Sequence, residues 1–226
     1  MRVLRGRATT IEEDRAVTRA LAGDVEASGE PTVRAWTPHR QVAFGRRDAR
    51  SDGYGRAKRA AEERGFPTHE RDVGGRAVAY TGNTAAFVRV EPVADVRGGT
   101  DERYDRIVAE LRGALASLDV EAWEGEPSDA FCPGAHSLST DAGKVVGVAQ
   151  RVRQGSAAVA GIVLVRDHDE IVRVLDPVYE ALGVPFDPGS VGSVATSGGP
   201  ADSERVARAV ESALVGDRDA RVERVR

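Results

Sequence analysis

Residues 144–165 read KVVGVAQRVRQGSAAVAGIVLV, and this stretch decides the fold class. Valine, isoleucine and small apolar residues fill 144–152 and again 157–165, a composition typical of β-strands. A polar loop over 124–143 precedes the pair. Six more strands are expected, at 31–36, 41–44, 68–72, 76–80, 84–90 and 120–123. Gly82-Asn83 separates the strands at 76–80 and 84–90, and this dipeptide is typical of a hairpin turn.

Helices are expected between these strands. Thr10 and Glu13 have the spacing of a capping box, which predicts a helix that begins at residue 11 and ends near Gly23. Further helices are expected over 52–64, 101–118, 169–175, 177–182 and 203–214, with a surface loop at 196–200. Helices scattered among strands with long irregular connections indicate one α+β domain, 1–226, built on a mainly antiparallel sheet flanked by helices.

The composition excludes several classes of protein. Of the 226 residues, 41% are hydrophobic, enough for a sizeable core. No apolar run reaches the roughly 18 residues of a membrane-spanning helix, and the first residues lack the apolar segment of a signal peptide. The net charge of −4, without a basic run, argues against nucleic acid as a partner. We therefore expect a cytoplasmic protein that binds neither membrane nor nucleic acid.

The first segment with chemical potential is ERDVGGRAV, residues 70–78. Gly74 and Gly75 allow a ligand to approach the backbone N–H groups, and Arg71 and Arg76 add permanently charged donors that suit a phosphate or carboxylate. The alternative is an ordinary glycine turn between strands with solvated arginines.

A second candidate is Lys144, which opens an apolar strand. An ammonium at the end of an apolar slot could hold a phosphate or polarise an acyl carbonyl. Alternation places Lys144, Val146 and Val148 on one face of the strand and Gly147 and Ala149 on the other. The alternative is that Lys144 is an exposed first residue of the strand.

The third candidate is Cys132, the only cysteine, which excludes an internal disulfide. His136 follows four residues later, so a thiolate nucleophile with an imidazole base is conceivable. The alternative is a buried packing residue. His39, His69 and His168 show no metal-ligand spacing with one another or with Cys132, so no metal site is expected.

Taken together and in this order, these segments resemble the lipoate–protein ligase and octanoyltransferase family. RAWTP at 34–38 with VAFGR at 42–46 is similar to the family's R-x-W-x-P and V-x-x-G start. Residues 71–78 are similar to its R-R-x-(S/T)-G-G-(G/R)-A-V segment, and 143–150 to its G-x-K-(I/V)-(A/S)-G-(S/A)-A-Q segment. The resemblance implies the class II aminoacyl-tRNA synthetase and biotin-protein-ligase type of catalytic domain.

The resemblance also implies roles for particular residues. Lys144 would contact the reacting acyl carbonyl or adenylate, and Cys132 would form the acyl-thioester of the transferase branch. The binding residues would be Arg71, Gly74, Gly75, Arg76, Ala77, His136, Gly147 and Ala149. Three departures from the pattern are Glu70 for the first arginine, Val73 for Ser/Thr, and 135–137 in place of an Asn-Asp pair.

The activity implied is attachment of lipoate or octanoate, through an amide bond, to a lysine of a lipoyl domain in a 2-oxoacid dehydrogenase or glycine-cleavage protein. The ligase route uses ATP with Mg, whereas the transferase route needs no cofactor and takes octanoyl from a donor such as an octanoyl carrier protein. The family's small accessory domain is not apparent, so a separate accessory subunit is one expectation. The alternatives are a biotin–protein ligase-like enzyme and a non-catalytic relative that binds acyl ligand or carrier protein.

Overall fold

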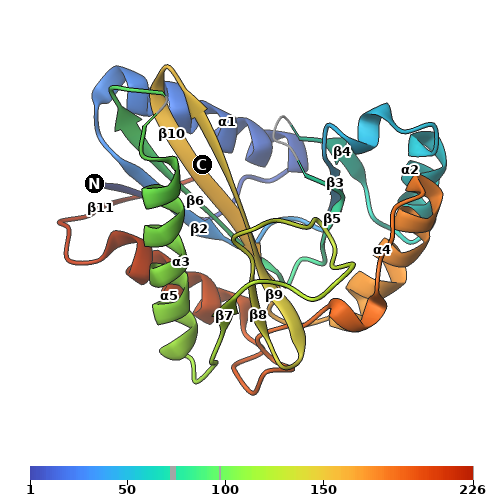
Figure 1. The fold of residues 1–226 in the computed structure, drawn as a ribbon. Helices are drawn as coiled ribbons and strands as arrows, with labels where there is room; N and C mark the ends of the chain where they lie inside the picture. Colours follow the sequence, from blue (N-terminus) through green and yellow to red (C-terminus); the bar gives the residue numbers. More distant parts are fainter. Residues whose placement is uncertain (72–74, 97, 226) are drawn as a thin grey trace.

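A computed structural model describes residues 1–71, 75–96 and 98–225. Its main feature is an eight-stranded sheet (Figure 1). In spatial order its strands are β11 (Arg221–Arg224), β1 (Arg2–Arg5), β2 (Thr32–Trp36), β6 (Ala85–Val93), β10 (Gly155–Val163), β9 (Gly143–Arg153), β8 (Leu138–Thr140) and β7 (Trp123–Glu124). The pairs β11–β1 and β1–β2 are parallel, and the others are antiparallel. The expected α+β class with a mainly antiparallel sheet is confirmed.

A three-stranded sheet lies beside the large one. β3 (Gln41–Phe44) is its centre, with β4 (Thr68–Glu70) parallel and β5 (Val78–Tyr80) antiparallel to it. The hairpin predicted at Gly82-Asn83 is therefore wrong, because β5 pairs with β3 whereas β6 pairs with β2 and β10. The Asn83 amide donates to Asp167 Oδ2 at 2.7 Å and accepts from Arg166 at 2.7 Å, so it fixes a crossover between sheets.

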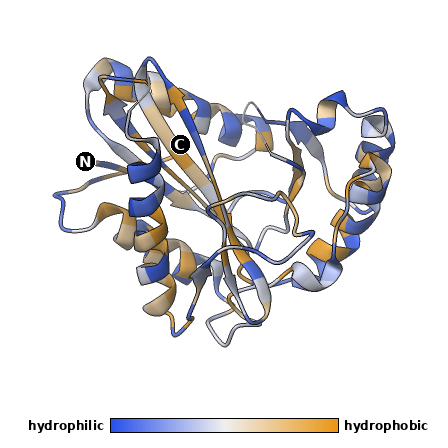
Figure 2. Cartoon of the chain, viewed as in Figure 1, coloured by the Kyte–Doolittle hydropathy of each residue, from blue (hydrophilic) through white to orange (hydrophobic). Residues whose placement is uncertain are grey.

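The helices pack on these sheets in three groups (Figure 1). α3 (Thr100–Ala116) and α5 (Ser203–Val215) bury residues such as Ile107, Leu111 and Val206 in the largest apolar cluster. α1 (Ile11–Ser28) packs Leu21 and Val25 against β6. α2 (Tyr54–Glu62) and α4 (His168–Leu182) form an apolar cluster with the small sheet. In Figure 2, orange and blue alternate along α3, α4 and α5, as expected for helices with one apolar face.

The capping box at the start of α1 is confirmed: Glu13 N–H donates to Thr10 Oγ1 at 3.3 Å, and Thr10 N–H donates to Glu13 Oε2 at 3.0 Å. The helix runs past Gly23 to Ser28, since Leu21 and Val25 continue its buried stripe. The two helices predicted over 169–182 are one helix, α4, with Pro177 inside it. Its buried stripe on both sides of Pro177 offsets the lost backbone hydrogen bond.

Two further boundaries differ from the sequence prediction. The strand expected at 120–123 is only the pair 123–124, because Val120 packs into the core after α3 instead of pairing. The polar loop expected over 124–143 contains β8, which pairs with the start of β9. Short 3₁₀ helices occupy Asp48–Arg50 and Pro188–Ser190. Within the described ranges, no helix combines the length and apolar character needed to cross a bilayer.

Close contact between the central strands requires a glycine at position 161 of β10. A Cβ on Gly161 of β10 would lie 2.2 Å from Gly147 O and 2.5 Å from the Phe87 ring. Any larger residue would push the three central strands apart. Gly161 therefore lets Phe87 pack under the sheet beside the pocket described next.

Candidate active site

Cys132 lies in the loop between β7 and β8, in a strained conformation. Its φ is +43°, in the left-handed region that non-glycine residues rarely adopt. The half-buried Sγ accepts hydrogen bonds from Arg76 N–H at 3.4 Å and Arg71 Nη2 at 3.5 Å. Both donors point at the one atom that could act as a nucleophile here.

Gly75 leaves room for this sulfur. Its φ is +93°, and a Cβ there would lie 2.8 Å from Cys132 Sγ. Glycine is thus required twice at this position, for its backbone conformation and for its close approach to the thiol. Gly74, the other half of the predicted diglycine, lies outside the described residues.

Tyr179 of α4 joins the two segments that form this site. Its hydroxyl accepts a hydrogen bond from Cys132 N–H at 2.6 Å and donates one to Ala77 O at 3.0 Å. The side chain is fully buried, and burial raises its pKa well above the usual value. The hydroxyl therefore keeps its proton and makes both bonds.

Lys144 lies beneath the same loop. Its Nζ donates to Glu126 Oε2 at 2.7 Å and to the carbonyl oxygens of Phe131 and Cys132, both at 2.9 Å. The side chain is fully buried, so the alternative of an exposed first residue is wrong. All three donors of the ammonium are used, and one of them holds Cys132 by its carbonyl.

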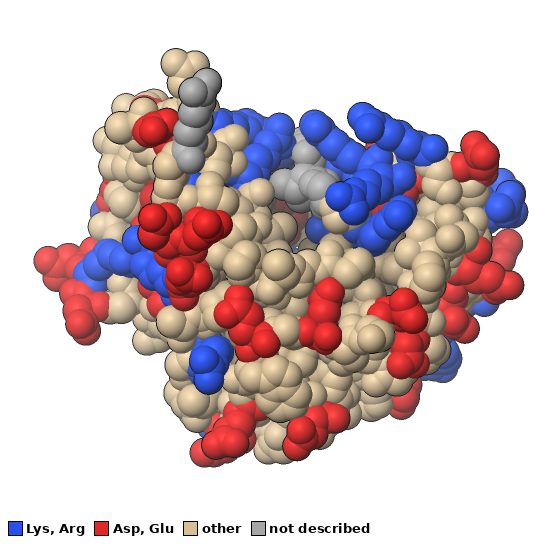
Figure 3. Space-filling view, in the orientation of Figure 1, with Lys and Arg blue, Asp and Glu red and all other residues tan. Residues whose placement is uncertain are grey.

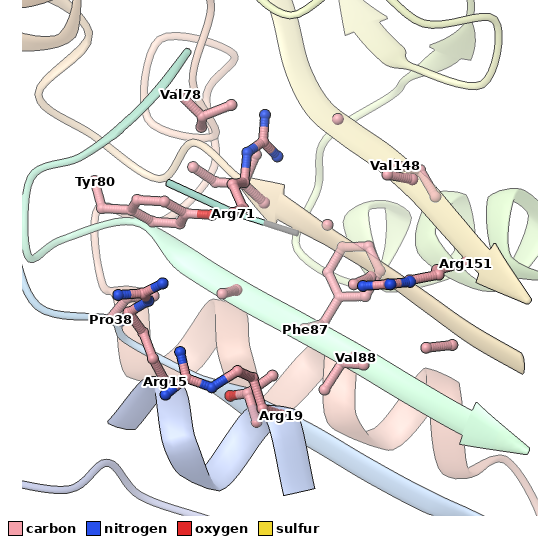
Figure 4. Close-up of a pocket in the computed structure, with 18 of the residues that line it drawn as sticks. Arg15, Arg19, Pro38, Arg71, Val78, Tyr80, Phe87, Val88, Val148 and Arg151 are labelled. Atoms are coloured by element: carbon pink, nitrogen blue, oxygen red, sulfur yellow. The ribbon is translucent and has the colours of Figure 1, made fainter. Parts of the chain in front are cut away.

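An apolar pocket opens beside Cys132, with a volume of about 310 Å³. α1 and the strands β6, β9 and β10 form most of its wall, and Figure 4 shows Phe87, Val88 and Val148 lying around it. Small-molecule sites typically begin at about 300 Å³. Gly147, Ala149, Arg151 and Arg153 alternate along β9 and all line the pocket, so this face of β9 meets it, and Val148 also contributes to the lining.

Cationic side chains surround the same pocket. Burial opposes the charge of Arg71, but Cys132 and Tyr80 outweigh it, and the pKa of Arg71 is raised. Burial, with Arg15 and Arg71 nearby, lowers the pKa of His69 to about 4. His69 is therefore neutral at pH 7 and adds no charge to the apolar wall.

The other predicted site residues are spread around this centre. Arg76 donates its backbone N–H to the thiol, while its guanidinium pairs with buried Asp48 at 3.2 Å. Ala77 is buried in the core and contributes its carbonyl to Tyr179. His136 stacks on Tyr104, with 3.9 Å between ring centroids, and bonds Glu124 at 2.9 Å. Its ring is thus engaged away from the thiol, and neither the thiol's hydrogen bonds nor the pocket wall includes it.

The comparisons with known proteins agree with this architecture. The family model of the lipoyl protein ligase A/B catalytic domain matches residues 10–212. The chain belongs to this family. Within the described ranges, no group of three or more His, Cys, Asp or Glu residues is arranged to hold a metal ion.

Two curated relatives of the lipoyl protein ligase family are octanoyl-[GcvH]:protein N-octanoyltransferases. The one from Kyrpidia tusciae is 31% identical over 148 residues, which cover 66% of this chain and 51% of the relative. The one from Geobacillus kaustophilus is 26% identical over 147 residues, 65% of this chain and 50% of the relative. The chain thus spans about half the length of the curated relatives it matches.

Solved structures share the fold. A lipoate-protein ligase A bound with ATP has a TM-score of 0.79 at 19% identity, covering 100% of this chain and 89% of that one. A putative lipoate protein ligase from T. acidophilum with bound lipoic acid has a TM-score of 0.76 at 18% identity, with the same coverage. At these identities the likeness concerns the fold alone.

Sequence reasoning missed Tyr179 and Glu126. Tyr179 lies on a helix 47 residues from Cys132, and nothing in its local pattern distinguishes it from a core tyrosine. Glu126 is one acid in a polar loop that has several. A buried lysine needs a counter-charge, so a partner for Lys144 could have been sought in that loop, but the sequence does not say which acid it is.

Proposed function

We propose that this chain is a cysteine-dependent acyltransferase that moves an octanoyl group onto a lysine of a lipoyl-domain protein. One observation carries the proposal: the Cys132 thiol accepts two N–H donors and lines an apolar pocket of about 310 Å³. A nucleophile, its electrostatic support and room for an acyl tail thus meet at one atom.

The first half of the reaction transfers the acyl group to sulfur. The Cys132 thiolate attacks the carbonyl carbon of the donor, forming an S–C bond, and the donor's C–S or C–N bond breaks. The leaving thiolate or amine takes up a proton, and the octanoyl group remains on Cys132 as a thioester. Arg71 and the Arg76 N–H stabilise the thiolate before the attack.

The second half regenerates the enzyme. The neutral ε-amine of the acceptor lysine attacks the thioester carbonyl, an amide C–N bond forms and the C–S bond to Cys132 breaks. The amine loses its proton, and the thiolate returns to its two donors. No external energy source is needed, because a thioester donor is already activated and an amide donor exchanges one amide bond for another, with the Cys132 thioester as the intermediate in both cases.

Lys144 supports this cycle by holding the nucleophile loop. Its ammonium binds the Phe131 and Cys132 carbonyls and is balanced by Glu126. It thereby holds the Cys132 backbone by its carbonyl, while the Tyr179 hydroxyl holds it by its N–H.

The names of the curated relatives support a protein-bound octanoyl donor and a protein acceptor, and GcvH is the carrier that those names give. The competing ligase route would use free lipoate or octanoate with Mg·ATP. Two of the arginines that could bind the phosphates of ATP already have partners: Arg71 donates a hydrogen bond to the Cys132 thiol, and Arg76 forms an ion pair with Asp48. The transferase route is therefore the one we propose, without a cofactor; an accessory subunit would be a partner for the ligase route.

The test measures the intact mass of an apo lipoyl domain after incubation with this chain. Three donors are offered separately: octanoyl-GcvH, octanoyl acyl carrier protein, and octanoate or lipoate with Mg·ATP. We expect an octanoyl mass gain with a protein-bound donor, and loss of that gain in Cys132→Ser. Gain that requires Mg·ATP and survives Cys132→Ser overturns the proposal in favour of a ligase. If no donor produces a mass gain, the result favours a non-catalytic relative. If the acceptor gains the mass of biotin when biotin and Mg·ATP are supplied, the result favours a biotin ligase.

A matched control separates nucleophile loss from loop damage. Ser139 lies in β8 near the same loop, and Ser139→Ala removes one hydroxyl that bonds Gly125 O at 2.8 Å. We expect this variant to keep most of the acyl transfer that Cys132→Ser loses.

A further inference from the structure

The pocket is bordered by arginines on two sides. Arg151 and Arg153 on β9 line it, as do Arg15 and Arg19 on α1. Figure 4 shows Arg15 and Arg19 across the pocket from Arg151. Arg46 and Arg47 follow β3, and both are exposed. We call the four arginines 46, 47, 151 and 153 the basic rim.

The basic rim is not neutralised by its neighbours. None of its four arginines forms an ion pair with a described carboxylate, whereas Arg15 and Arg19 share Glu12. The whole chain nevertheless carries a net charge of −4. Figure 3 shows this separation: Lys and Arg gather over α1 and over the segment between β3 and α2, while Asp and Glu dominate the lower half of the same face.

The rim also lies next to the thiol. A Cβ on Gly45, the residue before Arg46, would lie 2.0 Å from Gly75 O, so the two backbones touch. Gly75 in turn touches Cys132 Sγ. Arg46 and Arg47 therefore follow directly on a backbone segment that packs against Gly75, while Arg151 and Arg153 on β9 line the pocket itself.

We propose that the basic rim is the docking surface for an acidic carrier domain, the protein that presents the lysine-linked acyl chain or the acceptor lysine at Cys132. A chain attached to a protein reaches the thiol only when that protein lies against the pocket entrance. The arginines of the basic rim, which have no ion-pair partner among the described carboxylates, attract a carrier with acidic residues around its lysine and orient it. The inference rests on the proposed function and adds the surface and its charge.

The experiment compares two double charge reversals. Arg46→Glu/Arg47→Glu changes the rim. Arg205→Glu/Arg224→Glu makes the same charge change on α5 and β11, at exposed positions far from the pocket that form no ion pair with a described residue. The dissociation constant of apo lipoyl domain is measured by calorimetry for both variants at low and high salt. Octanoylation of Cys132 by octanoyl-N-acetylcysteamine, an uncharged small thioester, is followed by mass in parallel.

We expect the rim variant to bind the lipoyl domain about tenfold more weakly at low salt, with a flatter salt dependence, because salt screens exposed charges. The control variant binds as the unchanged protein does, and the small thioester reacts equally with all three. Unchanged binding by the rim variant, or equal weakening in both variants, overturns the docking proposal. If the small thioester does not acylate Cys132 in the unchanged protein, that result contradicts the proposed function. The binding measurement then still tests, independently, whether the basic rim is the docking surface.

Discussion

At the scale of single residues, the site depends on the hydroxyl of Tyr179. That oxygen holds the Cys132 N–H at 2.6 Å and the Ala77 carbonyl at 3.0 Å, and so links the nucleophile loop to the segment that supplies the Arg76 N–H. Because Cys132 has a strained φ of +43°, its backbone needs such restraints to stay in place. Tyr179 is a positioning residue that acts through Cys132.

Tyr179→Phe removes the hydroxyl and keeps the ring in the core. We expect the rate of Cys132 alkylation by iodoacetamide at pH 7 to fall about tenfold, because the thiol leaves its N–H donors. As Cys132 is the only cysteine, alkylation reports on it alone. Tyr104→Phe, on the ring that stacks with His136, is the control and keeps the original rate. A Tyr179→Phe rate equal to that of the unchanged protein would contradict the positioning role.

The sequence pointed to Cys132, Lys144, Arg71 and Gly75, and the structure brings them together. A short motif can be recognised because its residues stay adjacent along the chain. Tyr179 and Glu126 could not be found in this way, since their roles arise only when α4 and the loop before β8 meet the 75–77 segment. His136 shows the converse: closeness to Cys132 in sequence did not place its ring at the thiol.

At the scale of elements, three adjacent strands build the wall of the pocket. Ala160 of β10 pairs with Ala149 of β9 and Val88 of β6, and all three line the pocket. Alternation along β10 adds Ala158 and Ile162 on the same face. Ala149, Ala158 and Ala160 leave open space along this wall, so we expect their size to limit the acyl chain that fits.

Ala160→Leu places a larger side chain on that wall. We expect acylation of Cys132 by octanoyl-N-acetylcysteamine to slow by about 5- to 150-fold, which corresponds to an overpacking cost of about 1–3 kcal/mol. Acetyl-N-acetylcysteamine, whose chain does not reach the wall, should react nearly as before. The control Ala20→Leu adds the same atoms on the exposed side of α1 and should change neither rate. If Ala160→Leu slows the reactions of both thioesters equally, Ala160 does not determine which acyl chain length the pocket accepts.

Element prediction succeeded where local pattern and tertiary pairing agreed. The long strands β9 and β10 were found from their apolar runs, and α1 from its capping box. It failed at Gly82-Asn83, where a good turn sequence serves a crossover between two sheets, because strand partners are chosen by packing and not by the turn alone. The sequence prediction also divided α4 into two helices at Pro177, because the low helix propensity of proline was not weighed against the buried apolar residues on both sides of it.

At the scale of the whole molecule, a buried charge pair joins the N-terminal elements to the sheet. The fully buried guanidinium of Arg34 in β2 bonds Asp14 of α1, and also Thr18 at 2.6 Å and Gly6 O at 3.0 Å. Asp14 also accepts a hydrogen bond from Trp36 Nε1 at 3.0 Å, and Asp14 and Trp36 both line the pocket. Stability and pocket shape thus depend on the same pair.

Removing one charge of this pair should destabilise the entire fold. Asp14→Asn keeps the shape but leaves Arg34 buried without its counter-charge, which costs about 3–5 kcal/mol. For a chain of this size each kcal/mol lowers the melting temperature by about 2–4 °C, so a fall of about 6–20 °C is expected by calorimetry. Asp24→Asn, which breaks an exposed pair with Arg2, should cost less than about 1 kcal/mol.

Asp14→Asn/Arg34→Met replaces both charges and should recover part of the loss, because the penalty comes from the unpaired charge and not from the absence of the bond. A double variant less stable than Asp14→Asn alone would show instead that the hydrogen bonds of Arg34 to Thr18 and Gly6 hold α1 on the sheet.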